Sequence, residues 1–164
     1  DGTDLGIGSG KRFRMQSQNR IRYLNSMANA YRITSDQTLS NNTNTIVEFN
    51  GEQFDTDTIH DNSTNPGRLT AKLAGKYLVT CSIRWEGNAT GSRSVGLRKN
   101  GTTFISANGS KDVEGNHVIV TGSPVIIDLA ANDYVEVIAF QDSGGDLDII
   151  VDTRTTISMA YIGE

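Results

Sequence analysis

The sequence has few of the residues that restrict a small protein covalently or conformationally. Of its 164 residues, one is cysteine (Cys81), two are proline (Pro66 and Pro124), and aromatic residues make up 7%. A single cysteine excludes an internal disulfide framework. No apolar run reaches the roughly 20 residues of a membrane-spanning helix, and no signal-peptide pattern is present, so we expect no membrane insertion. Because the sequence begins at Asp1 rather than at methionine, we expect a fragment or a processed chain.

Turn-forming residues, by contrast, are abundant: the sequence has 17 glycines and many Asn, Thr, Ser and Asp residues. These polar residues compete for backbone hydrogen bonds inside a helix, and glycine is costly there, so long helices are disfavoured. Only Asn25–Ala30 is compatible with a helix. Short stretches between the turns show the period of two that is typical of strands. The predicted strands are Ala30–Thr34, Thr45–Phe49, Leu69–Leu73, Tyr77–Trp85, Ser94–Lys99, Thr103–Ala107, Val118–Thr121, Val125–Leu129, Tyr134–Gln141, Asp148–Val151 and Thr155–Ile162. So many short strands predict one all-β sandwich or barrel.

Two of these strands indicate which faces are buried. In Tyr77–Trp85 every second residue from Tyr77 onward is apolar, and Cys81 is among them, so we expect a buried, unreactive thiol. Tyr134–Gln141 is apolar on both faces apart from Glu136 and Gln141. Such a strand is either central in a sandwich or covered by another subunit.

The amino-terminal segment is basic, whereas the remainder is acidic. Residues 1–25 carry five basic and two acidic side chains, a local net of +3, so the remainder carries −7 because the whole chain carries −4. Arg12–Tyr23 holds two stretches that alternate arginine with a large apolar residue, which predicts a β-hairpin with all arginines on one face. A binding site for single-stranded nucleic acid would need aromatic residues on the same face as the arginines. Phe13 and Tyr23 point away from them, so we favour a structural hairpin and expect no nucleic-acid partner.

Four segments of the chain follow one another in a recognisable order. The first is Val47–Trp85, with Phe49, Asn50, Phe54, Asp55, Leu69, Gly75 and Tyr77 at its characteristic positions. It resembles the corresponding part of the globular head of complement C1q and its bacterial and phage relatives. Leu97–Thr102 resembles the hairpin of that family, Asp128–Val137 its Leu-x-x-Gly-Asp-x-Val segment, and Ile157–Gly163 its closing strand. Asn132 stands where glycine is usual in the family, so the chain departs from the family pattern at this turn.

The resemblance covers Ala30 to Gly163 and implies an all-β jelly-roll sandwich, like that of tumour necrosis factor (TNF), assembled as a homotrimer. The first ten residues, DGTDLGIGSG, also resemble the Leu-Gly-Ile-Gly segments of phage tail-fibre and tail-spike shafts. We therefore predict two parts: a Gly-rich stalk with a β-hairpin arm at residues 1–29, and a jelly-roll head at residues 30–164. The residues predicted to meet other copies are Phe13, Ile21, Tyr23, Tyr134, Ile138, Phe140, Met159 and Tyr161.

The leading functional hypothesis is a non-enzymatic phage virion-surface protein whose head binds a glycan or protein on the host cell. One alternative is a capsid-decorating protein that contacts other virion proteins through its arm, and another is a secreted, complement-type ligand-binding head. Neither His60 nor His117 has a nucleophile motif beside it, so we expect no catalytic site. Polar loops carry recognition in such folds, and the predicted ligand-binding residues are Thr56, Asp57, His60, Asp61, Asn88, Asn108, Asn116, Asp142 and Asp146.

Two groups of carboxylates raise the question of a metal. Asp55, Asp57 and Asp61 would suit Ca²⁺, which prefers oxygen ligands from loops. The second group is Asp142, Asp146, Asp148 and Asp152. Neither group has the spacing of an EF-hand loop. The competing interpretation, which we favour, is that these acidic loops are only solvated, with no cofactor bound.

Overall fold

The structure is a computed structural model that describes residues 26–111 and 115–164, and in these residues it contains strands and no helix. The predicted hairpin at Arg12–Tyr23 lies outside the described residues. The strands are β1 (Met27–Arg32), β2 (Gln37–Leu39), β3 (Thr45–Ile46), β4 (Gly51–Asp55), β5 (His60–Asp61), β6 (Asn65–Thr70), β7 (Gly75–Trp85), β8 (Arg93–Lys99), β9 (Thr103–Ser110), β10 (Val118–Thr121), β11 (Val125–Leu129), β12 (Tyr134–Gln141), β13 (Leu147–Ile149) and β14 (Asp152–Gly163).

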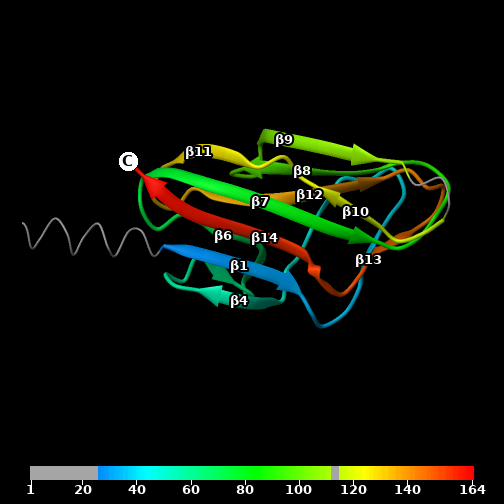
Figure 1. Ribbon diagram of the computed structural model, residues 1–164, viewed down its shortest axis with the longest axis horizontal. Helices are drawn as coiled ribbons and strands as arrows, with labels where there is room; N and C mark the ends of the chain where they lie inside the picture. The colour runs from blue at the N-terminus through cyan, green and yellow to red at the C-terminus, as the bar shows by residue number, and fades with distance from the viewer. Residues whose placement is uncertain (1–25, 112–114) are drawn as a thin grey trace, which may run out of the picture.

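The strands form two antiparallel sheets that pack face to face (Figure 1). The first, called sheet A here, has the order β2-β13-β7-β14-β1-β4, and β10 and β11 also pair with β7. The second, sheet B, has the order β5-β6-β12-β8-β9, and β3 pairs with β12. Strands far apart in sequence are therefore neighbours, as a jelly roll requires, and the predicted all-β sandwich is confirmed.

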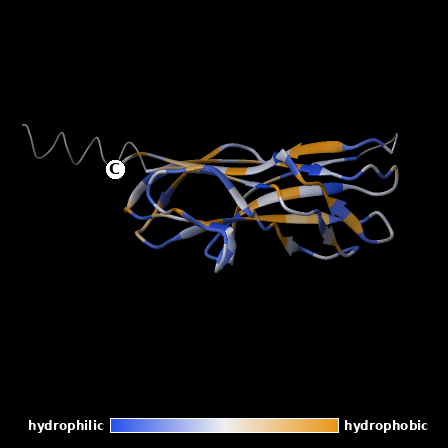
Figure 2. Cartoon of the chain, turned by 90° about the horizontal axis from the view of Figure 1, so that it is seen from below, coloured by the Kyte–Doolittle hydropathy of each residue, from blue (hydrophilic) through white to orange (hydrophobic). Residues whose placement is uncertain are grey.

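The core lies between the two sheets and is built by alternation along each strand. In β7 the five predicted inward residues, from Tyr77 to Trp85, expose between 0% and 4% of their surface. Cys81 is one of them, and burial raises the pKa of its thiol to about 11. The expected burial of this cysteine is confirmed. Figure 2 shows hydrophobic residues along the strands and hydrophilic residues in the connecting loops.

Strand β12 occupies the centre of sheet B, between β6 and β8. Val135, Val137 and Ala139 face the core, and on the outward face Glu136 and Ile138 are also buried, at 1% and 4% exposure. The structure thus agrees with the first interpretation of this doubly apolar strand, because β12 is central in its sheet and Glu136 and Ile138 are already buried within the single chain.

The expectation of a helix-compatible segment at Asn25–Ala30 is wrong. Met27–Arg32 is strand β1, which pairs with β14 on one side and β4 on the other. Ala28 and Ala30 face the core at 1% and 0% exposure, so period two rather than helical period governs this segment. Ser26 is also fully buried. Ser26 and strand β1 are therefore part of the sandwich.

Three short strands, β2, β4 and β5, were not predicted from the sequence. Their residues are mostly polar and exposed, as in the pattern of β4, where only Gly51 is buried. Pairing with β1, β6 or β13 makes them strands, and such long-range pairing leaves no local signal. The turn at Asn132 is well formed, because Asn132 has a φ of 73°, a left-handed conformation that asparagine tolerates where the family usually has glycine.

Candidate binding surfaces

Several loops meet at the end of the sandwich opposite the carboxyl terminus, and we call this region the loop end (Figure 1). The segment between β7 and β8 packs on the segment before β10, since a Cβ added to Gly87 would lie 2.2 Å from the carbonyl oxygen of Gly115. Ser92 and Asp142 exchange hydrogen bonds between the β7–β8 and β12–β13 loops. Gly144 donates to Oδ1 of Asn41 at 2.9 Å.

Two buried polar side chains hold the loop end in place. The guanidinium of Arg93, fully buried, donates to the carbonyl oxygens of Asn88 at 2.5 Å, Thr90 at 2.8 Å and Gly91 at 3.2 Å. Gln141 lies opposite Arg93 in the sheet and donates to the carbonyls of Leu39 and Gly145 while accepting from Ser143. Sequence reasoning missed both residues, because each sits at the end of a strand and gives no local sign that it will be buried.

The structure brings only some of the predicted ligand-binding residues together. Those at the loop end are Asn88, Asn116, Asp142 and Asp146. Asn108 lies within β9, where its side chain donates to the carbonyl of Thr121 at 2.9 Å. Thr56, Asp57, His60 and Asp61 belong to the β4–β6 region, and Thr56 is held to the start of β1 by Met27. The single surface implied by the prediction is therefore split among separate regions.

His60 has a structural environment. Its ring is buried, with Nδ1 2.9 Å from a carboxylate oxygen of Glu52 and Nε2 3.1 Å from the carbonyl oxygen of Pro66. His117 lies 3.1 Å from the carbonyl oxygen of Trp85. The partners of both imidazoles are thus acceptor oxygens that fasten one strand or loop to another, with no nucleophile among them.

Two of the three carboxylates considered for Ca²⁺, Asp55 and Asp61, close turns of their own, whereas Asp57 accepts from the hydroxyl of Ser26 at 2.9 Å. Asp55 accepts from the backbone N–H groups of Asp57, Ile59 and His60. Asp61 accepts from Ser63 and Thr64, and these hydrogen bonds lower the pKa of its carboxyl. Over residues 26–111 and 115–164, no three His, Cys, Asp or Glu side chains come close enough to hold a metal ion.

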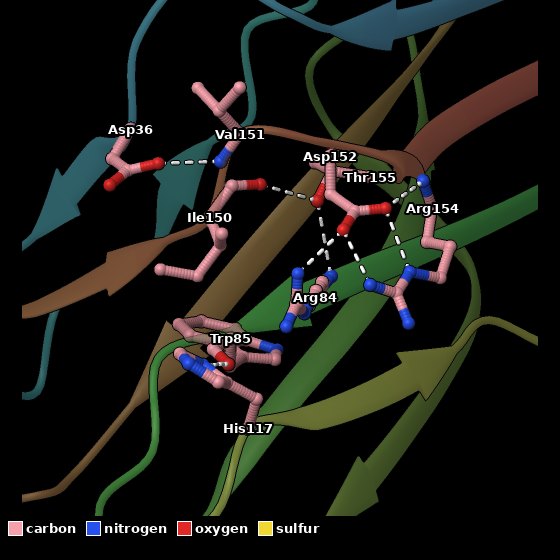
Figure 3. A network of polar contacts seen from close by, with 9 residues as sticks. All are labelled: Asp36, Arg84, Trp85, His117, Ile150, Val151, Asp152, Arg154 and Thr155. Carbon is pink, nitrogen blue, oxygen red and sulfur yellow. Dashed lines mark hydrogen bonds and ion pairs between the residues drawn. The ribbon is translucent and has the colours of Figure 1, made fainter.

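The second acidic group is likewise dispersed, and Asp152 serves as an ion-pair centre (Figure 3). Its carboxylate accepts from Arg154 at 2.6 and 2.8 Å and from Arg84 at 2.6 Å. The hydrogen bonds from Arg154, above all, lower the pKa of Asp152. Figure 3 also shows Thr155 donating to Ile150 and Asp36 accepting from the N–H of Val151. These contacts fasten the irregular start of β14.

The outward face of sheet A carries four apolar side chains in register, which we call the apolar row. Met27 on β1, Ala160 on β14, Leu78 on β7 and Ile126 on β11 lie opposite one another in turn. Leu78 is 39% exposed and Ile126 is 65% exposed. A depression of about 100 Å³ on this face is lined by Met27, Ala28, Phe54, Leu78, Thr80, Ser158, Met159 and Ala160.

Beside the apolar row, the same face becomes polar. Asn29 on β1 donates to the hydroxyls of Thr156 and Ser158 on the neighbouring strand β14, at 2.8 and 2.7 Å. An exposed apolar patch with a polar border is typical of protein–protein contact sites.

The residues predicted to form the trimer interface do not lie in the apolar row. Met159 and Tyr161 point into the core at 1% and 7% exposure, so the outward residues of β14 are the intervening ones. Tyr134, Ile138 and Phe140 lie on the outward face of sheet B, on the other side of the sandwich. Phe13, Ile21 and Tyr23 lie outside the described residues. A shift of one position along a strand exchanges the two faces, and this accounts for the difference at Met159 and Tyr161.

Comparison with solved structures identifies the architecture. The globular domain of zebrafish complement 1qA superposes with a TM-score of 0.60 at 13% sequence identity, over 84% of this chain and 97% of that one. The chain has the C1q/TNF jelly-roll fold. Eiger TNF from S. frugiperda matches with a TM-score of 0.59 at 16% identity, over 84% of this chain and 92% of that one. Murine APRIL matches with a TM-score of 0.61 at 11% identity, over 84% of this chain and 98% of that one.

At these identities the likeness establishes the fold alone. No protein-family model and no curated protein matches the sequence. No helix in the described parts of the chain is long and apolar enough to cross a membrane.

Proposed function

We propose that this chain is the head of a homotrimer, and that the apolar row of sheet A is the surface through which three copies meet. The observation that carries this proposal is the row itself, because four apolar side chains lie in register on the outward face of sheet A, and the exposed Phe54 lies beside them. Burying that surface stabilises the head by association, which a chain with one buried cysteine cannot achieve through disulfides.

The proposed role of the trimer is adhesion at a phage virion surface, as the receptor-binding head of a tail fibre or spike. Two features support it: the Gly-rich first ten residues resemble fibre-shaft segments, and the loop end is held rigidly by Arg93 and Gln141. Pre-ordered loops lose little conformational freedom when they bind. Three identical heads on one shaft also gain avidity for a repetitive cell surface.

A capsid-decorating role is the second candidate, supported by the +3 charge of residues 1–25, which would dock on an acidic capsid surface. A secreted, complement-type head that binds a protein ligand is a third.

Two measurements test the proposal. Sedimentation equilibrium of the full chain at micromolar concentration should give three times the monomer mass of 17.8 kDa, and a monomer would refute the assembly. The purified trimer should then bind bacterial cells that the intact phage attaches to. If it binds capsids instead, and deletion of residues 1–25 abolishes this binding, the decorating role replaces adhesion.

A further inference from the structure

We infer that the outward face of sheet B carries a binding site for an acidic saccharide, formed by Phe104 and Arg98 and positioned by Glu136. This inference deepens the proposed adhesion role and rests on it for its biological meaning. The site differs from the loop end and from the apolar row. Because it lies on the sheet opposite the apolar row, it remains accessible when three copies assemble.

Phe104 forms an open aromatic platform. It is 58% exposed, more than any other aromatic residue in the described parts of the chain. Its ring is held against Gly96 of the neighbouring strand β8, since a Cβ added to Gly96 would lie 3.4 Å from Cδ1 and Cε1 of Phe104. An aromatic ring that covers a glycine across a strand pair shields the exposed backbone. That packing fixes one side of the ring and leaves the other open to solvent.

A guanidinium lies beside this platform. Arg98 is directly opposite Phe104 in the β8–β9 pair and directly opposite Glu136 in the β8–β12 pair. Its Nε donates to Oε1 of Glu136 at 2.7 Å. Among the hydrogen bonds of the described residues, Arg98 makes no other with its side chain, so both of its Nη groups can donate to a ligand. The side chain of Arg98 is 22% exposed.

Glu136 acts as a positioning residue. Its side chain is 1% exposed, so it does not reach a ligand, and its contact with Arg98 fixes the plane of the guanidinium. Removing the Glu136 carboxylate from water costs free energy, and its attraction to Arg98 seldom compensates for that cost in full. The ion pair is therefore weak evidence for a purely stabilising role. A fixed guanidinium matches the bidentate geometry of a carboxylate ligand.

The charge around the pair is positive. Arg68, on the far side of Glu136 in the sheet, places its guanidinium carbon 4.0 Å from the centre of the Tyr134 ring. Two guanidinium groups therefore flank one carboxylate on the surface of a chain whose net charge is −4. A local positive spot on an acidic protein favours an anionic partner over a neutral one.

The chemistry of the ligand follows from these parts. The exposed side of Phe104 offers stacking to a flat apolar face, as a pyranose ring has, and Arg98 offers paired donors to a carboxylate. A uronic acid combines both groups in one residue. The platform is open rather than concave, so one sugar would bind weakly. Three such sites on one trimer would bind a repetitive acidic polysaccharide with far higher avidity.

The experiment measures binding of the intact trimer to immobilised polygalacturonate by surface plasmon resonance. Methyl-esterified polygalacturonate serves as the neutral counterpart, since it keeps the rings and removes the charge. We expect binding to polygalacturonate at least tenfold tighter than to the ester. Phe104→Ala should weaken binding to both polymers at least tenfold, and Phe104→Tyr should restore it.

Arg98→Gln should abolish the preference for the charged polymer, whereas Arg154→Gln, which removes an exposed arginine elsewhere, should leave it unchanged. Ile33→Ala is the matched apolar control for Phe104→Ala, because Ile33 is 47% exposed and lies off this face. Equal losses for Arg154→Gln and Arg98→Gln, or full binding by Phe104→Ala, would overturn the inference. No binding of the wild-type trimer to polygalacturonate would also overturn it.

A cell-binding assay distinguishes failure of the saccharide site from failure of the proposed adhesion function. If the wild-type trimer and Phe104→Ala bind bacterial cells equally, the saccharide site is wrong and adhesion stands. If the wild-type trimer binds neither cells nor capsids, the proposed function itself fails.

Discussion

Replacing Leu78 with alanine removes a central side chain of the apolar row while leaving the core of each head intact. A leucine side chain gains about 1.5–3 kcal/mol when it is fully buried. In the single chain Leu78 is 39% exposed. Association can therefore supply at most about 1 kcal/mol from this residue in each copy.

In Leu78→Ala all three copies lose this contribution to the free energy of association, which amounts to about 2–3 kcal/mol per trimer. Since each 1.4 kcal/mol is tenfold in an equilibrium constant, the trimer should dissociate roughly 30–150 times more readily. Leu78→Asp should have a larger effect, because a carboxylate buried at the interface costs several kcal/mol in each copy. We expect that variant to be monomeric at micromolar concentration.

Sedimentation velocity over a dilution series measures both changes, and thermal unfolding of the dissociated chain checks that the head still folds. Ile33→Ala is the control, because it truncates an aliphatic side chain of similar exposure that lies off the row. The reasoning is refuted if Leu78→Asp remains trimeric, or if Ile33→Ala shifts the dissociation as far as Leu78→Ala does.

Other residues give predictions for a single head. Asp133 and Asp152 are expected to make it sensitive to acid, because hydrogen bonds from Lys99 hold the pKa of Asp133 at about 2 and those from Arg154 lower that of Asp152. Depressed pKa values contribute stability above pH 4 that is lost as pH falls towards 2, so the melting temperature should drop over that window, and less so in Asp133→Asn. Ile157→Ala should cost about 2–5 kcal/mol in urea unfolding, since Ile157 is fully buried between the sheets. Asn132→Gly should leave stability within about 1 kcal/mol of the wild type, whereas Asn132→Val should cost about 1–2 kcal/mol because a β-branched residue is strained at a φ of 73°. Cys81 should react with a thiol reagent only after unfolding, and fast labelling of the native protein would contradict its burial.

The sequence predicted the strands best where alternation was strong. β7, β10, β11 and β12 have the predicted bounds, apart from two extra residues at the start of β7. It failed where local preference and pairing disagree, as in β1, whose alanines suit a helix but pack as alternate residues of a strand. It also missed β4, whose polar residues form a strand because β1 offers an unpaired edge.

The candidate sites were less predictable than the fold. Polar loops could be recognised, but the hydrogen bonds that make the loop end rigid come from Arg93 and Gln141, which are brought together by the pairing of β8 with β12. Phe104 and Arg98 gave no signal either, because their proximity depends on the register of β8 and β9 and on a bulge between Leu97 and Arg98.

The sequence by itself determined that the chain is an all-β protein without disulfides, with a buried Cys81 and with the order of segments typical of a C1q-like head. These properties follow from composition and from alternation within a strand, which depend on near neighbours along the chain. Only the tertiary structure decided that Met159 and Tyr161 face inward, that Met27, Leu78 and Ile126 form one row, and that the predicted acidic groups do not gather. Those outcomes depend on which strands pair and in which register, and a step of one residue in register exchanges the core face for the surface.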